Sequence, residues 1–96
     1  MTQYFLSPEA QESLRQIKAY SIQQFGAERT RLYLQDILNC FRALAENPHQ
    51  GLSRDELKPG YFSSFVGTHT IYYRIKSDRI EIIDVLHQSM EPERHL

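Results

Sequence analysis

The chain has 96 residues, and its 11 lysines and arginines nearly balance 12 aspartates and glutamates, which leaves a formal charge of -1. This length predicts a single domain over residues 1–96, with one core and no room for a deep enclosed pocket. The balanced charge argues against a protein that binds nucleic acid through a cationic surplus. Cys40 is the single cysteine, so the chain holds no disulfide framework of its own.

The N-terminal segment predicts a short strand that leads directly into a helix. Residues 3–6 are mainly aromatic and apolar, which is typical of a strand. Ser7 can cap a helix with its side-chain oxygen, and Pro8 suits the first helical position. Apolar residues then recur on one stripe until Gly26, which can adopt the left-handed conformation that ends many helices. We therefore expect the first helix over residues 8–25.

The next segment predicts a second helix that folds back on the first. Apolar residues follow a 3.6-residue period over residues 27–46, and Pro48 ends the pattern because it disfavours helical geometry in the residue before it. Only a residue or two separate the helices, so we expect them to form an antiparallel hairpin. Residues 49–60 are mainly polar and contain glycine and proline, which predicts a loop.

After this loop the pattern changes to the two-residue alternation of strands. Strands are expected over residues 61–66, 69–76 and 79–87, and the tight turns between them require antiparallel pairing. Together with the N-terminal elements they predict an α+β fold: an N-terminal strand and an antiparallel two-helix hairpin packed on a mainly antiparallel sheet, with a C-terminal three-strand meander.

The last predicted strand is apolar on both of its faces. Strict alternation divides its residues into two sets, with Ile80, Ile82, Asp84 and Leu86 on one face and Glu81, Ile83, Val85 and His87 on the other. Two helices can cover only one of these faces. Ile22 and Leu32 also fall outside the apolar stripes of their helices. These features predict that a partner chain covers apolar surface here.

Residue patterns that would carry chemistry are sparse. The four histidines fall in different segments without metal-ligand spacing, so we expect no metal site and no cofactor. The serines lack a nucleophile elbow, and no glycine-rich phosphate loop occurs. Acid–base cleavage of RNA would need a cluster with more cations than accompany the available candidates, which are Tyr72, Tyr73, Arg74 and His87. We therefore expect no enzyme activity, with an RNA endonuclease as the alternative.

Several stretches, in order along nearly the whole chain, resemble one family. They are YFLSPEA at residues 4–10, FG at 25–26, LAENP at 44–48, Gly51 with RDELKPG at 54–60, HTIYYR at 69–74 and IDVLHQSM at 83–90. This ordered set resembles the ParE toxins of bacterial type II toxin–antitoxin modules, within the RelE/ParE superfamily. The resemblance implies a RelE/ParE-like fold similar to the one that the residue patterns predict.

The resemblance also implies a function. A ParE toxin poisons DNA gyrase without being an enzyme, stalls replication, and is neutralised by a ParD-type antitoxin. The antitoxin carries the DNA-binding part that represses the operon, so the toxin would reach operator DNA only indirectly, within a hetero-oligomer. RelE relatives instead cleave ribosome-bound mRNA with basic residues and a C-terminal tyrosine, and no tyrosine follows Tyr73 here. No secretion signal or membrane-length apolar run is evident, so we expect a cytoplasmic protein without membrane contact.

Two candidate surfaces accompany this function. The candidates for contact with the target lie at and after the end of the last strand: His87, Gln88, Met90 and Glu91. The candidates for contact with the antitoxin are Ile22, Leu32, Tyr72 and Arg74. Two positions depart from the family pattern, because members commonly carry arginine where this chain has Asp84 and a basic residue where it has Ser89. These departures leave a further alternative open, a detoxified member that binds its antitoxin and acts as a co-repressor.

Overall fold

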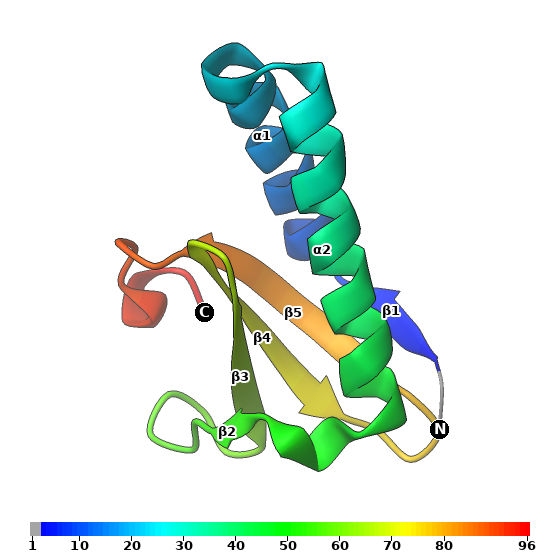
Figure 1. Cartoon of the computed structure of the whole chain (residues 1–96). Helices are drawn as coiled ribbons and strands as arrows, with labels where there is room; N and C mark the ends of the chain where they lie inside the picture. The colour runs from blue at the N-terminus through cyan, green and yellow to red at the C-terminus, as the bar shows by residue number, and fades with distance from the viewer. Residues whose placement is uncertain (1–2) are drawn as a thin grey trace.

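Two helices lie against one face of a five-stranded sheet in the computed structural model, which describes residues 3–96 (Figure 1). In chain order the elements are β1 (Tyr4–Leu6), α1 (Pro8–Phe25), α2 (Ala27–Glu46), β2 (Leu52–Ser53), β3 (Tyr61–Val66), β4 (His69–Ile75) and β5 (Ile80–His87). The strand order is β1-β5-β4-β3-β2, in which β1 and β5 pair in parallel and the other neighbours are antiparallel. This arrangement confirms the predicted α+β fold.

The element boundaries follow the sequence prediction closely in the helices and less closely in the sheet. Both helices have the predicted bounds. The strands expected over residues 69–76 and 79–87 are each one residue longer than β4 and β5. The expected loop over residues 49–60 contains β2, whose residues pair with β3. A two-residue strand is too short to show alternation, so the sequence pattern did not reveal it.

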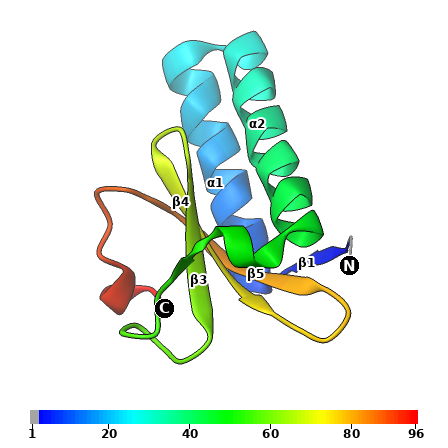
Figure 2. The ribbon, with the colours of Figure 1, turned by 60° about the horizontal axis from the view of Figure 1, so that its bottom comes forward.

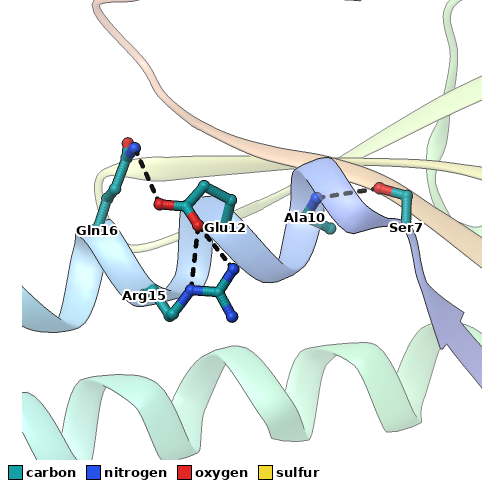
Figure 3. Close-up of polar contacts among 5 residues, drawn as sticks. All are labelled: Ser7, Ala10, Glu12, Arg15 and Gln16. Carbon is teal, nitrogen blue, oxygen red and sulfur yellow. Dashed lines mark hydrogen bonds and ion pairs between the residues drawn. The ribbon is translucent and has the colours of Figure 1, made fainter.

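One serine caps the start of α1 (Figure 3) and also bonds it to β5. Ser7 has the extended backbone of an N-cap, and its Oγ accepts a hydrogen bond from Ala10 N at 3.0 Å, as predicted. The same Oγ donates to Ile83 O at 2.6 Å, and Ser7 N donates to Ile82 O at 3.0 Å. The cap therefore sets both the first turn of the helix and its position on the sheet.

A single residue joins α1 to α2. Gly26 has a φ of +85°, in the left-handed region that side chains disfavour. Its N–H donates to Ile22 O at 3.0 Å and ends α1, while its carbonyl accepts from Thr30 N at 3.2 Å and from Thr30 Oγ1 at 2.8 Å to begin α2. The connected helix pair stands out beyond the sheet in Figure 1.

The core fills the space between the helix pair and the sheet. Its fully buried members come from both layers: Ala10, Ile37, Phe41, Leu44 and Ala45 from the helices, and Ile71, Tyr73, Ile80 and Ile82 from the strands. Tyr73 carries a polar group into this core, but its hydroxyl donates to Pro48 O at 2.7 Å. That bond removes the penalty of an unpaired buried hydroxyl and ties the end of α2 to β4.

A β-bulge in β5 overturns the predicted division of this strand into two faces. Tyr72 pairs with Asp84 but the next residue, Tyr73, pairs with Ile82, so β5 contains one extra residue at this point. The extra residue reverses the alternation beyond it. As a result Ile82 shares the core with Val85, and the prediction that it shares a face with Leu86 was wrong.

The face of the sheet away from the helices is partly covered by the chain itself. Leu86 and Tyr72 are only 3% and 4% exposed although they lie outside the core cluster. The segment after β5 turns away from the helices, back towards the loop after β2 (Figure 2), and Met90 and Pro92 line a small groove with Tyr72. Burial of these two side chains therefore needs no partner. The same face still exposes Leu52 (63%) and Phe65 (65%), which the ladder places on the side of Tyr72.

Candidate functional site

An open groove of about 740 Å³ lies between the helix pair and one end of the sheet. Its helix wall is mostly apolar and includes Ile17, Tyr20, Phe25, Leu32 and Tyr33, and its sheet side includes His69, Val85, His87 and Met90. Tyr20, Phe25 and Leu32 are each half or more exposed. Binding sites are typically concave and apolar with a few polar groups, and this groove has that character.

Tyr33 closes the groove where α2 approaches the turn between β3 and β4. Its hydroxyl lies 3.1 Å from Val66 O, 3.1 Å from Thr68 N and 2.6 Å from His69 Nδ1. Its ring packs so closely on Gly67 that any Cβ there would collide with it. The turn is therefore held against α2, which fixes the width of the groove at this end.

Two histidines form the polar end of the groove. His69 on β4 and His87 on β5 are directly opposite each other in the ladder, with ring centroids 5.3 Å apart and ring planes at 87°. Burial, and secondarily the nearby His87, lower the pKa of half-buried His69 below its ordinary value. His87 is exposed, and its Nδ1 lies 3.1 Å from Ser89 N and 2.8 Å from Ser89 Oγ.

Three of the four candidates for target contact line a common groove, and Glu91 does not join them. His87 and Met90 line the groove. Gln88 instead supports the β3–β4 turn, because its N donates to Thr68 O at 2.9 Å and its Nε2 donates to Gly67 O at 3.2 Å. Glu91 pairs through Oε2 with Arg94 Nε at 3.0 Å. His87, Gln88 and Met90 also line the smaller groove together, so the structure brings three of these residues to one place. Glu91 lines neither groove.

The four candidates for antitoxin contact lie at separate places. Leu32 lines the groove, whereas Ile22 is exposed on α1 and belongs to neither groove. Tyr72 lines the smaller groove of about 230 Å³ on the opposite face. Arg74 pairs with Glu81 across β4 and β5, with 3.2 Å between Nε and Oε1.

The smaller groove offers less free charge than its residues suggest. Arg54 lies 5.7 Å from the ring centre of Tyr72, but its Nε also pairs with Glu56 Oε2 at 2.6 Å. His87 and Met90 line this groove as well as the larger one. These two residues therefore sit on the rim between the two grooves.

Asp84 is a structural residue of the bulge. It is only 6% exposed, and its Oδ1 accepts hydrogen bonds from Ser13 Oγ at 2.6 Å and from Val85 N at 2.8 Å. The carboxylate thus anchors α1 to β5 and satisfies a backbone donor, in keeping with the rule that buried charges are hydrogen-bonded. It does not present a free negative charge to a partner.

The residues that sequence reasoning missed are Tyr33 and His69. The pattern placed Tyr33 in the second helix without a role, and it placed His69 near a strand start as a surface or cross-strand residue. One signal could have found His69. The short turn at residues 67–68 sets the strand pairing, and that pairing places the start of β4 opposite the end of β5. The contact with α2 requires tertiary structure.

Over residues 3–96 no three histidine, cysteine or carboxylate side chains converge as they would around a metal ion. Within the same part of the chain, neither helix is long and apolar enough to cross a membrane.

Known proteins similar in sequence to this chain belong to one family. A family model described as the ParE toxin of the type II toxin–antitoxin system parDE matches residues 4–92. A protein of Mycobacterium tuberculosis (strain ATCC 25618 / H37Rv) named Toxin ParE1 is 34% identical over 96 residues, which are 99% of this chain and 98% of the relative. Toxin ParE1 of Caulobacter vibrioides is 38% identical over 96 residues, 100% of this chain and 99% of the relative.

Two solved structures with a similar fold come from toxin–antitoxin systems. One is the chromosomal ParDE system from P. aeruginosa, with a TM-score of 0.78, 21% identity, and coverage of 91% of this chain and 96% of that chain. Another is the YoeB–YefM complex from Staphylococcus aureus, with a TM-score of 0.60, 18% identity, and coverage of 91% and 97%. At these identities the likeness is one of fold.

Proposed function

Because the chain belongs to the ParE toxin family of type II toxin–antitoxin systems, we propose that it inhibits DNA gyrase in the bacterial cytoplasm and is neutralised by a ParD-like antitoxin. The groove supports the antitoxin part of this proposal. Leu32 and Phe25 on its helix wall are half or more exposed. An amphipathic segment of the antitoxin would bury these side chains, at roughly 25 cal/mol for each Å² removed from water.

The position of the groove also supports a means of neutralisation. His87 and Met90 were nominated for target contact, and both line the groove that we assign to the antitoxin. A segment seated there would cover them, so that antitoxin and target could not use them at the same time. The formal charge of -1 agrees with contact to operator DNA through the antitoxin alone.

We propose action by binding, without catalysis. The RNA-cleaving alternative would need its candidate groups to converge, but the ladder places Tyr72 and Tyr73 differently. The hydroxyl of Tyr73 is committed to Pro48 O inside the core, whereas Tyr72 lines the smaller groove on the other face. Arg74 is paired with Glu81. Tyr72 and His87 do share the smaller groove, but Tyr73 and Arg74 do not join them there, which argues against an endonuclease.

The decisive experiment is induction of the chain in cells that lack its antitoxin, followed by incubation of the purified protein with gyrase and DNA. Growth arrest with trapped, cleaved gyrase–DNA complexes would support the proposal. Ribosome-dependent mRNA cuts with gyrase unaffected would favour the endonuclease. Normal growth of cells that contain the folded chain would contradict toxicity and favour the co-repressor.

Matched variants test the seat of the antitoxin. Leu32→Glu places a charge on the groove wall, and Ile22→Glu places the same charge on the same helix pair outside the groove. We expect Leu32→Glu to remain toxic when a ParD-like antitoxin is co-expressed, while Ile22→Glu is still rescued. Equal rescue of both variants would show that the antitoxin binds elsewhere.

A further inference from the structure

We propose that the histidine pair at the sheet end of the groove recognises a carboxylate, so that the segment that occupies the groove presents an aspartate or glutamate to His69 and His87. This inference rests on the proposed function, because it specifies the chemistry of the partner that the groove binds. It also makes a prediction for the isolated chain that can be tested without any partner.

The hydrogen bonds of His87 determine which of its nitrogens carries the proton. Ser89 N is a backbone donor and lies 3.1 Å from His87 Nδ1, so Nδ1 accepts. In the neutral ring the proton is therefore on Nε2. Among residues 3–96, Nε2 of His87 has no hydrogen-bond partner, and it remains a free donor on an exposed side chain. An apolar segment laid over it would leave this donor unpaired, which is costly, unless the segment supplies an acceptor.

His69 can take up a second proton while the hydrogen bonds around the Tyr33 hydroxyl are kept. The single proton of the Tyr33 hydroxyl can go to His69 Nδ1 or to Val66 O, and Thr68 N donates to the same oxygen. When His69 is protonated, its Nδ1 donates to the Tyr33 oxygen and the hydroxyl donates to Val66 O. Protonated His69 carries a proton on Nε2 as well, so both members of the opposed pair then have an Nε2–H donor.

A carboxylate is the ligand that matches this arrangement. It accepts from two N–H groups at once, and charge-assisted bonds of this kind are stronger than neutral ones. It also opposes the two effects, burial and the neighbouring imidazole, that lower the pKa of His69 in the free chain. Binding of a carboxylate is therefore coupled to proton uptake at His69, and affinity rises as the pH falls.

Other ionisable groups also line the groove. Tyr20 faces it from α1, and Arg29, Tyr33 and Asp36 face it from α2. The segment after β5 contributes Met90, which carries no charge. The reference pKa values of carboxyl, guanidinium and phenol side chains lie outside the interval between about pH 6 and pH 8, whereas that of imidazole lies within it.

Octanoate is a suitable probe, because it joins a carboxylate to an apolar tail, and 1-octanol is its uncharged match. Binding of each to the isolated full chain is followed by NMR at about pH 6 and about pH 8, where octanoate stays ionised. We expect octanoate to bind about threefold to tenfold more tightly at the lower pH, because its carboxylate then contacts a protonated, positively charged His69. We expect 1-octanol to show no such change.

Variants connect the effect to the histidines. His87→Phe keeps an aromatic ring at an exposed position but removes both nitrogens, and it should abolish the preference for octanoate over 1-octanol. His95→Gln changes an exposed histidine outside both grooves and should leave the preference intact. If His87→Phe fails to fold, His87→Gln provides the second test, since its amide keeps one donor and should retain part of the preference.

The proposal is overturned if octanoate does not bind, if it binds no better than 1-octanol, or if its affinity is the same at both pH values. An equal loss in His95→Gln would overturn it as well. Failure of the proposed function can be told apart from failure of this proposal, because a chain that never binds a ParD-like antitoxin could still bind octanoate through His69 and His87.

Discussion

Replacing Ser7 by alanine should destabilise the fold by about 2 kcal/mol. The change removes the N-cap bond to Ala10 N, and loss of such a cap costs about 1 kcal/mol. It also removes the donor to Ile83 O, which at 2.6 Å joins α1 to the bulge of β5, and an ordinary net hydrogen bond contributes about 1 kcal/mol. For a domain of this size, the sum corresponds to a fall in Tm of roughly 8–16 °C.

The two parts can be separated by a second variant. Ser7→Asp can still accept from Ala10 N but cannot donate to Ile83 O, so it should lose about half as much stability. Urea unfolding followed by far-UV circular dichroism measures both, with Ser53→Ala as a control on an exposed strand residue. The reasoning is refuted if Ser7→Ala lies within about 0.5 kcal/mol of the parent, the range of ordinary surface substitutions.

Three further outcomes follow from the groove and the bulge. Gly67→Ala combines a φ of +54° with a collision against the Tyr33 ring, so thermal melting should show a loss of about 1–3 kcal/mol. Asp84→Ala leaves Ser13 Oγ and a backbone donor without their acceptor, and urea unfolding should reveal a loss of about 1–3 kcal/mol. The lowered pKa of His69 means that the unfolded state binds its proton more readily. Its stabilising contribution is present above the unfolded value of 6.5 and is lost as the pH falls through the lower folded value, so the Tm should decrease on acidification, and less so in His69→Gln.

The helices could be predicted to the residue because each boundary carries its own local signal. Ser7 and Pro8 begin α1, Gly26 separates the helices, and Pro48 follows the end of α2. The bulge in β5 could not be predicted in this way. Counting alternate residues assumes that every residue has one partner across the ladder, and Ile83 violates that assumption without any change in its own chemistry.

The candidate site was only partly visible in the sequence, for a related reason. Leu32 and His87 were noticed because each departs from a local pattern, an apolar residue off its stripe and a histidine at the end of an apolar strand. Tyr33 and His69 fit their local patterns, because one is an aromatic residue in a helix and the other is a polar residue at the start of a strand. Their importance comes from a 2.6 Å contact between segments 36 residues apart, which no local pattern contains.

The parallel pairing of β1 with β5 has a consequence for how the molecule is made. Tyr4 lies beside Ile80, and Ser7 is bonded to Ile83, 76 residues later in the chain. A growing polypeptide can form the helix hairpin early, from contacts close in sequence, but β1 has no strand to pair with until β5 has been synthesised. The groove needs the end of β5 as well as both helices. The binding surface therefore does not exist on a nascent chain until β5 has been synthesised.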